Sequence, residues 1–417
     1  QRQAMANNSR PTPTMAPNNS LRWERCSMDI DHLSLHCRQH SHTVLTEATP
    51  VPQWIDDRVS LTQVLEAMQA SPMHVLDTEF ERVRTFWPKL ALVQVALPAR
   101  NVLIDPLAFA DLGDLGRVLG NGRPWLMHSA SEDLVALKPL TEHAPTALFD
   151  TQIAAALLGL GSSLAYQKLV QSELGVSLAK SETRSDWLQR PLSAEQIDYA
   201  ADDVIHLQAL CDRLGDRLDR LGRMDWLWQD GQRQIAAGYE LLPSANPHHE
   251  FRAAYKLPLA AQVRLVAVLE WRERTARSTD RPRSWVLDNA TAIDIAQNPP
   301  RSGPELLGKL ANCRAFPRRQ VGEVIDLLAS AEAGAPFQPA PAPLDRETEN
   351  ALRQAREQID ALAAALALES STLCSRRLLE ARARLGTWPP DCTRWRQQLL
   401  EPLVQATLGA SSPTQNP

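Results

Sequence analysis

The sequence predicts an α/β domain built on a mixed sheet, followed by two all-α helical modules. Short apolar segments of strand length recur between residues 73 and 128, and helical patterns then alternate with them. That alternation favours a sheet covered by helices. After about residue 223, apolar residues recur only at helical spacing. The proline-rich segment 333–343 divides this helical part in two, as an extended linker would.

The elements of the α/β domain follow one another along residues 49–222. A helix is predicted over 60–70, and three apolar runs of strand length follow at 73–80, 90–96 and 101–105. The remaining elements are a strand over 124–128 and helices over 107–119, 131–138, 150–159, 163–174 and 193–221. Three successive strands followed by helix, strand and helix predict a mixed sheet.

The rest of the chain divides at changes of composition. Residues 1–48 are rich in Asn, Ser, Pro, Thr and His with little apolar periodicity, which predicts a disordered extension. The His and Cys residues of this segment match no zinc-binding spacing. Beyond the α/β domain we expect a linker over 223–256, a helical module over 257–332, a proline-rich linker over 333–344 and a second helical module over 345–412.

The composition is typical of a globular cytoplasmic protein. Of the 417 residues, 44% are hydrophobic and 22% charged. No apolar run reaches the length of a membrane span, the first fifty residues lack a secretory core, and the six cysteines form no CxxC pair. We expect a cytoplasmic monomer with free thiols and no membrane contact. The net charge of −5 argues against a generic basic coat protein but not against a nuclease, whose acidic site attracts cations.

The first candidate for chemistry is Asp77-Thr78-Glu79, at the end of a predicted strand. Residues i and i+2 of a strand point to the same face, so the two carboxylates project together. Clustered acids at the end of a buried strand are costly unless a cation compensates them. The alternative is an ordinary strand end that enters a loop.

Two later segments carry further acids. Asp133 lies in the first turn of a predicted helix, with Ser129 or Ser131 as the N-cap, although acids favour helix N-termini for electrostatic reasons alone. Tyr199 and Asp203 are four residues apart on a predicted helix and therefore share one face. The alternative for this second pair is a core tyrosine beside a solvated acid.

Together these residues follow the order Asp-x-Glu … Asp … Tyr-x-x-x-Asp. In this order the sequence resembles the tyrosine-bearing branch of the DEDD exonuclease superfamily and, within it, the ribonuclease D family. The resemblance covers about residues 50–222. Its motifs are Leu76-Asp-Thr-Glu-Phe80, Arg84-Thr-Phe-Trp-Pro-Lys-Leu-Ala-Leu-Val-Gln94, His128-Ser-Ala-Ser-Glu-Asp133, Phe149-Asp-Thr-Gln-Ile153, Lys180-Ser-Glu-Thr-Arg-Ser-Asp-Trp187 and Tyr199-Ala-Ala-Asp-Asp203.

The resemblance implies a ribonuclease H-like sheet and a 3′→5′ exoribonuclease that releases nucleoside 5′-monophosphates by two-metal-ion hydrolysis. Asp77 would bridge two Mg²⁺ or Mn²⁺ ions, with Glu79 and Asp203 on the side of the attacking water. Asp133 would serve the other ion. Tyr199 would orient the water, since an unperturbed tyrosine titrates near pH 10 and is a poor base at neutral pH.

Substrate contacts are predicted around these acids. Thr78 and Phe80 flank them and are expected at the terminal sugar and base, because aromatic stacking tolerates any base. Gln94 interrupts an apolar strand, which indicates either a buried hydrogen bond or a contact to the nucleotide.

Three further residues are candidates for substrate binding. His128 lies close in sequence to Asp133 and is interpreted as structural or substrate-contacting. Lys180 and Arg184 belong to a charged stretch before Trp187 and are expected to meet phosphate, with a solvated loop as the alternative.

The first helical module resembles the HRDC domain, a helical module of helicases and ribonuclease D. The matching runs are Leu269-Glu-Trp-Arg-Glu273, Ala276-Arg277 and Asp280-Arg-Pro-Arg-Ser-Trp-Val-Leu287. Residues 251–331 hold 13 Lys and Arg against 8 Asp and Glu, which predicts a surface that follows phosphates. Trp271 and Trp285 are equally compatible with a simple helical core. The second module resembles a more divergent copy, with matches at Ser375-Arg-Arg377, Trp395-Arg396 and Leu399-Leu400.

The predicted partner is RNA with a 3′ end, and the resemblance implies precursor tRNA. One alternative is a DNA 3′→5′ exonuclease, since HRDC modules also occur with DNA helicases. No GxxxxGK[ST] phosphate loop is present, which removes the helicase itself. The other alternative is a catalytically silent RNA-binding scaffold, which the intact set of acids disfavours.

Overall fold

The computed structural model describes residues 51–98, 100–178, 185–241, 243–331 and 337–408. The disordered extension expected over 1–48 lies outside them. The strands form a six-stranded sheet in the order β1-β4-β3-β2-β5-β6. Their bounds are β1 Gln53–Ile55, β2 His74–Glu81, β3 Lys89–Leu97, β4 Arg100–Ile104, β5 Trp125–Met127 and β6 Leu148–Asp150. The β2–β3 and β3–β4 pairs are antiparallel and the others parallel, which confirms the predicted mixed sheet.

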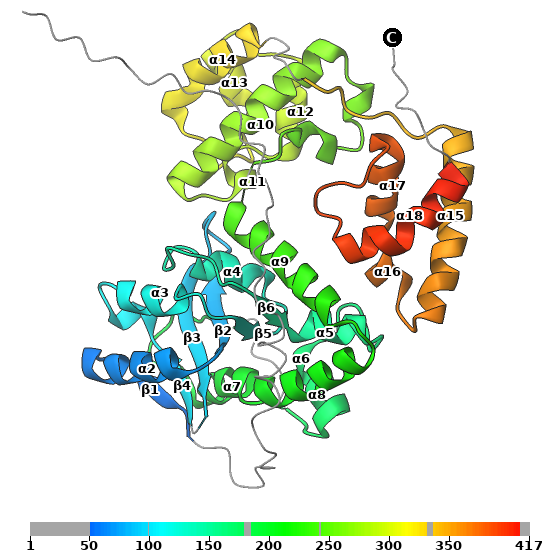
Figure 1. The fold of residues 1–417 in the computed structure, drawn as a ribbon. Helices are drawn as coiled ribbons and strands as arrows, with labels where there is room; N and C mark the ends of the chain where they lie inside the picture. The colour runs from blue at the N-terminus through cyan, green and yellow to red at the C-terminus, as the bar shows by residue number, and fades with distance from the viewer. Residues whose placement is uncertain (1–50, 99, 179–184, 242, 332–336, 409–417) are drawn as a thin grey trace, which may run out of the picture. The chain divides into compact units, whose positions relative to one another are not determined.

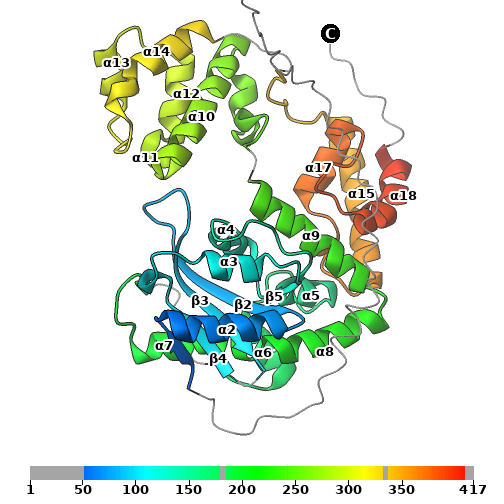
Figure 2. The same ribbon diagram turned by 60° about the vertical axis from the view of Figure 1, so that its left-hand side comes forward.

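Helices cover both faces of this sheet (Figures 1 and 2). One face packs against α2, α3, α4 and α9 through residues such as Leu76 and Trp125, and the other packs against α7 through Leu92 and Leu103. Helix α7 therefore lies over strands β2, β3 and β4. The helical bounds are α2 Arg58–Ala70, η1 Pro106–Ala108, α3 Gly113–Leu119, α4 Ser131–Leu137, α5 Thr151–Leu157, α6 Tyr166–Leu174, α7 Ala194–Ile205, α8 Leu207–Arg220 and α9 Met224–Glu240.

Several element boundaries differ from the sequence prediction. Strands β1 and β6, each of three residues, were not anticipated. The helix predicted over 107–119 is instead η1, an irregular connection and α3. The helix predicted over 193–221 is interrupted at His206, which ends α7 and precedes α8.

The prediction of a linker over 223–256 is wrong for residues 224–240. Residues Met224–Glu240 form helix α9, which packs on β6, α4 and α5. Two glycines allow this approach, because a Cβ on Gly231 would lie 2.4 Å from the Leu148 carbonyl oxygen and one on Gly238 would lie 2.7 Å from the Leu134 Cβ. The helix is therefore part of the α/β domain's packing, and only the residues after it connect to the next module.

The first helical module surrounds Trp271, which is 1% exposed. Trp285 is half-buried, with the Arg314 guanidinium 3.2 Å from its ring centroid. Phe86, from the turn between β2 and β3, joins the same core. The module consists of η2 Pro247–Glu250, η3 Ala254–Lys256, α10 Leu259–Thr279, α11 Arg283–Val286, α12 Asn289–Gln297, α13 Gly303–Lys309, η4 Arg318–Gln320 and α14 Val321–Ser330.

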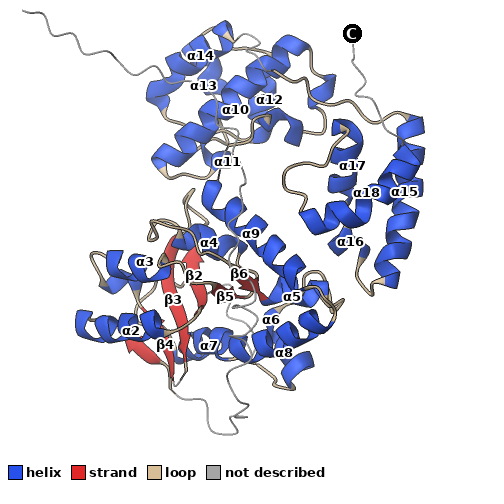
Figure 3. Ribbon diagram, viewed as in Figure 1, coloured by secondary structure: helices blue, strands red, loops and turns tan. Residues whose placement is uncertain are grey.

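The second helical module repeats a local pattern of the first. In each, a long helix is followed by a four-residue helix, an extended residue and a capped helix (Figure 3). In each, an arginine of the long helix donates to the carbonyl of the extended residue: Arg272 to Leu287 at 3.2 Å and Arg356 to Cys374 at 2.7 Å. This shared bond supports the predicted second copy. The helices are α15 Arg346–Ala365, α16 Ser370–Leu373, α17 Arg376–Leu385 and α18 Arg394–Leu408.

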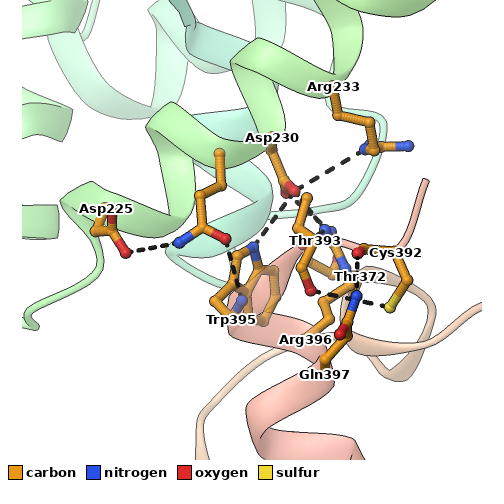
Figure 4. Close-up of polar contacts among 10 residues, drawn as sticks. Asp225, Asp230, Arg233, Thr372, Cys392, Thr393, Trp395, Arg396 and Gln397 are labelled. Atoms are coloured by element: carbon orange, nitrogen blue, oxygen red, sulfur yellow. Dashed lines mark hydrogen bonds and ion pairs between the residues drawn. The ribbon is translucent and has the colours of Figure 1, made fainter. Parts of the chain in front are cut away.

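Helix α9 also contacts the second helical module, through α18 (Figure 4). The Trp226 and Trp395 rings stack with centroids 4.4 Å apart and planes within 4°. The buried Asp230 carboxylate accepts hydrogen bonds from Trp395 Nε1 at 3.3 Å and Arg396 Nη2 at 2.8 Å. This contact is a buried ion pair completed by an indole donor, so it is specific to these partners.

No helix in the described part of the chain is long and apolar enough to cross a bilayer. The described cysteines, Cys211, Cys313, Cys374 and Cys392, are buried and form no disulfide with one another.

Candidate active site

Asp77 and Glu79 lie on β2, on the face covered by α7. In the register, Asp77 pairs with Gln94 and Glu79 with Leu92, and Leu92 belongs to the core under α7. Burial raises the pKa of Asp77 well above its usual range, and the nearby Asp133 and Asp203 carboxylates raise it further. Burial likewise raises the pKa of Glu79, to about 8, with Asp203 and Asp133 adding to the effect. Both acids are therefore hard to ionise without a compensating positive charge.

Asp133 lies in the first turn of α4 and is 7% exposed. Its carboxylate accepts a 2.5 Å hydrogen bond from the Thr78 hydroxyl on β2. Burial raises the pKa of Asp133 to about 7, although the Thr78 bond works in the opposite direction. The Thr78 hydroxyl thus orients Asp133, and the predicted contact of Thr78 with substrate stays a prediction.

The loop before α4 is held by Asp150, which the sequence analysis did not single out. The predicted N-cap, Ser129 or Ser131, is not the cap; Ala130 occupies that position and has no side-chain bond to the helix. The Asp150 carboxylate instead accepts from the backbone N–H groups of Ser129 and Ala130, both at 2.9 Å, and also caps α5. Ser129 has a φ of 58°, so these bonds stabilise a left-handed turn. The motif containing Asp150 was the only signal for this role.

Tyr199 and Asp203 occur on α7, whose start is fixed by a capping box between Ser193 and Gln196. The Tyr199 hydroxyl and the Asp203 carboxylate are hydrogen-bonded to each other. Burial raises the pKa of Asp203 to about 7. It also raises the pKa of the Tyr199 hydroxyl, as do the neighbouring carboxylates, led by Asp203. The phenol is therefore protonated at neutral pH and serves as a hydrogen-bond donor.

The predicted set of four acids and one tyrosine is thus gathered around β2, α4 and α7. The carboxylates are close enough to raise one another's pKa. Among the described residues, however, no three His, Cys, Asp or Glu side chains converge into a ready-made metal site. Two of the acids have local partners: Thr78 donates a hydrogen bond to Asp133, and Tyr199 is hydrogen-bonded to Asp203.

The other residues predicted to bind substrate differ in how exposed they are. Phe80 is half-buried at the end of β2, just after the register shift at Glu79. Gln94 is fully buried, so its side chain offers no surface to a nucleotide in this structure. Lys180 and Arg184 lie outside the described residues.

His128 packs within the protein beside the site. Its Nδ1 atom is 2.8 Å from the Thr151 hydroxyl, and its ring meets the Tyr166 ring edge-to-face at 5.4 Å. Burial lowers the pKa of His128, with the Asp150 carboxylate opposing the shift. These contacts favour the structural alternative, and substrate contact by His128 stays a prediction.

Arg190 is a second residue that sequence reasoning missed. Its guanidinium donates to both Asp105 carboxylate oxygens, at 2.7 and 2.6 Å, and to the Ala91 carbonyl at 2.7 Å. It also donates to the Trp187 carbonyl at 2.8 Å. Trp187 lies 6.0 Å from the Tyr199 ring, so Arg190 fixes the segment that supports the tyrosine. The bond spans 85 residues of sequence, and no local pattern indicates it.

Several known proteins are similar to this chain. The 3′–5′ exonuclease family matches residues 52–219, and the HRDC domain family matches residues 262–316. Ribonuclease D of Xanthomonas oryzae pv. oryzae is 40% identical over 370 residues, 87% of this chain and 99% of the relative. Ribonuclease D of Pseudomonas paraeruginosa is 38% identical over 378 residues, 87% of this chain and 98% of the relative. Among solved structures, Escherichia coli RNase D, an exoribonuclease involved in structured RNA processing, has a TM-score of 0.73 at 26% identity, covering 86% of this chain and 98% of that one.

Proposed function

The chain belongs to the ribonuclease D family of 3′→5′ exoribonucleases, and from this we propose that it removes nucleoside 5′-monophosphates from RNA 3′ ends with two divalent metal ions. Four buried or half-buried carboxylates lie around one tyrosine, and this arrangement is the main support for the proposal. What we propose beyond family membership is the use of metal ions, their number and the RNA substrate.

The residues fit hard divalent cations. The site offers oxygen donors only, the ligands that Mg²⁺ and Mn²⁺ prefer. Burial and mutual repulsion raise the pKa values of Asp77, Glu79 and Asp203. A cation would reverse that effect, because an opposite charge favours the ionised form. Asp77, Glu79, Asp133 and Asp203 are therefore the residues proposed to hold the metals.

When bound, two such ions would supply acidification of a water molecule and stabilisation of the charge that develops on the phosphate and the leaving oxygen. The protein's own part is to fix the ligands. Asp77 and Glu79 are fixed by the β2–β3 ladder, Asp133 by Thr78, and Asp203 by Tyr199. Such orientation by neighbouring groups is what outer hydrogen bonds contribute to metal sites.

Tyr199 is proposed to orient the attacking water rather than to deprotonate it. Its raised pKa means that the hydroxyl stays protonated near neutral pH, so Tyr199 does not act there as a phenolate base. Its ring is held against Trp187. Because the single hydroxyl proton is donated to the Asp203 carboxylate, the phenol oxygen is left to accept a hydrogen bond from the water.

The proposed substrate is RNA, with 3′-extended tRNA precursors as the class the family implies. Residues 251–331 carry the excess of Lys and Arg noted above, and Arg314, Arg318 and Arg319 are exposed on this module. Such a surface would contact phosphates without reading bases. The half-buried Phe80 is proposed to stack on the terminal base.

The experiment is a time course on 3′-extended tRNA and on single-stranded DNA of matched sequence, with Mg²⁺, Mn²⁺ or EDTA, for the wild type and Asp77→Asn. We expect metal-dependent release of nucleoside 5′-monophosphates from RNA, abolished by the substitution and weaker on DNA. Equal or faster action on DNA would favour the DNA exonuclease. Binding of RNA without cleavage would favour the silent scaffold.

A further inference from the structure

Gln94 is a polar residue inside an otherwise apolar strand. It is 0% exposed. Among the buried side chains of the described residues, it alone leaves both a donor and an acceptor, Nε2 and Oε1, without a hydrogen-bond partner. Burying an amide without partners is unfavourable, and an apolar residue of similar volume would fill the same space without that penalty. The amide therefore calls for a role other than packing.

The register of the sheet identifies what Gln94 faces. It pairs with Asp77 on β2 and with Leu103 on β4. Directly opposite residues of antiparallel strands point to the same face, with Cβ atoms about 4.5–5.5 Å apart. Leu103 is aliphatic and belongs to the core under α7, so Asp77 is the polar neighbour in this row. The other acid of the strand, Glu79, pairs with Leu92 and has no amide opposite it.

We propose that Gln94 is a positioning residue for Asp77, whose ionised carboxylate accepts a hydrogen bond from the Gln94 amide Nε2 when the site holds its cations. One carboxylate oxygen is thereby fixed from within the sheet, and the other oxygen remains directed to the metal. An amide suits this task because it donates without carrying charge, so it neither competes with the cations nor adds to the repulsion among the acids. The inference rests on the proposed function of the carboxylates as metal ligands.

A direct contact to the nucleotide is the competing role, and the geometry disfavours it. A 0%-exposed side chain on the face covered by α7 offers no surface to substrate. Gln94 therefore acts through Asp77, and its removal should change metal binding before it changes RNA binding. The amide has no partner in the metal-free protein, so replacing it with an apolar side chain should not lower the stability without metal.

Gln94→Leu is the test variant, made in the full chain, and Gln262→Leu is the matched control. Gln262 is also a buried glutamine, 4% exposed, but its Nε2 donates to Leu257 O at 3.0 Å and its Oε1 accepts from Ala340 N at 2.7 Å. Thermal unfolding is followed in EDTA and at increasing Mn²⁺, and KM for a short oligoadenylate is measured at saturating Mn²⁺. The readout is the Mn²⁺ concentration that gives half of the maximal rise in Tm.

We expect Gln94→Leu to keep or raise the Tm in EDTA, to increase the half-maximal Mn²⁺ concentration roughly tenfold, and to leave KM unchanged. Gln262→Leu should lower the Tm in EDTA and leave the Mn²⁺ dependence as in the wild type. An unchanged Mn²⁺ midpoint in Gln94→Leu, a lower Tm in EDTA, or a raised KM with an unchanged midpoint would each overturn the inference alone. A wild type that is not stabilised by Mn²⁺ would overturn the proposed metal site as well.

Discussion

The carboxylate of Asp280, in the first helical module, accepts a 2.9 Å hydrogen bond from the backbone N–H of Phe86, in the turn that follows β2. The same oxygen accepts from Trp87 N at 3.0 Å. The Phe86 ring is buried in the core of that module, with the guanidinium groups of Arg277 and Arg283 5.1 and 4.6 Å from its centroid. The HRDC-type module thus holds the turn between β2, which carries Asp77 and Glu79, and β3.

This contact predicts that Asp280 supports catalysis from outside the site. Asp280 has a φ of 49°, so Asp280→Gly and Asp280→Asn both tolerate the backbone, but only Asn retains an acceptor oxygen. We expect Asp280→Gly to lower stability by about 1–2 kcal/mol, since two part-buried backbone donors lose their acceptor, and to lower kcat/KM. Asp280→Asn should stay close to the wild type. Chemical denaturation and steady-state kinetics on the same RNA check this, and equal losses in both variants would contradict it.

The hydrogen bond from Thr78 to Asp133 leads to a second prediction, on metal affinity. Thr78→Val preserves the side-chain shape but removes the donor to Asp133, whereas Thr78→Ser retains it. Removing an outer hydrogen bond from a metal ligand lowers metal affinity or activity by roughly 10–100-fold. We expect that loss for Thr78→Val and near-wild-type behaviour for Thr78→Ser. Activity measured across a range of Mg²⁺ concentrations decides, and a wild-type Mg²⁺ profile for Thr78→Val would argue against an orienting role.

The buried contact between Arg396 and Asp230 predicts a large effect on stability. Arg396→Met leaves the buried Asp230 carboxylate with only the Trp395 indole at 3.3 Å and the Arg233 Nε at 4.0 Å. We therefore expect a loss of about 3 kcal/mol, the lower end for a broken buried ion pair. Arg394→Met is the matched control, because Arg394 is exposed on the same helix and its loss should change stability by less than about 0.5 kcal/mol. Denaturant unfolding of the full chain tests both. Similar small effects would mean that this pair does not hold the second module to α9.

The raised carboxyl pKa values predict how the stability of the metal-free protein depends on pH. Glu79, at about 8, and Asp133 and Asp203, at about 7, bind protons more tightly in the folded protein than in the unfolded one. Stability should therefore be fully present below about pH 4, where both forms are protonated, and fall as the pH rises towards 8. We expect a lower Tm in EDTA at pH 8.5 than at pH 6.

Glu79→Gln provides the control for this pH effect. The variant removes one titrating carboxyl, so its Tm should exceed that of the wild type at pH 8.5 and approach it at low pH. Saturating Mn²⁺ should reduce the pH dependence of the wild type, because cations stabilise the ionised acids. A metal-free Tm that rises between pH 6 and 8.5 would contradict the assigned shifts.

The parts of the site that could be predicted from the sequence are those set by local periodicity. Asp77 and Glu79 share a face because a strand has a period of two, and Tyr199 and Asp203 share one because they lie one helical turn apart. The mixed sheet could also be predicted, because β2, β3 and β4 are long enough to show the apolar pattern of strands. Such features need only the residues that form them.

What could not be predicted depends on contacts between distant segments. The Thr78–Asp133 bond joins residues 55 apart in sequence, and the Asp150–Ser129 bond joins residues 21 apart. Helix α9 was assigned to a linker, and its burial depends on β6, a strand that was not predicted. The sequence of one segment does not show which distant residue will contact it in the folded protein.

The central claim, that metal ions held by these four carboxylates act on the scissile phosphate, is tested most directly with a modified RNA. A sulfur atom replaces a non-bridging oxygen at the terminal phosphodiester, and the rate of nucleotide release is compared in Mg²⁺ and Mn²⁺. Because sulfur is a softer ligand than oxygen, we expect slow cleavage in Mg²⁺ and restoration by Mn²⁺. An equal effect of sulfur with both ions, or continued cleavage in EDTA, would contradict the claim.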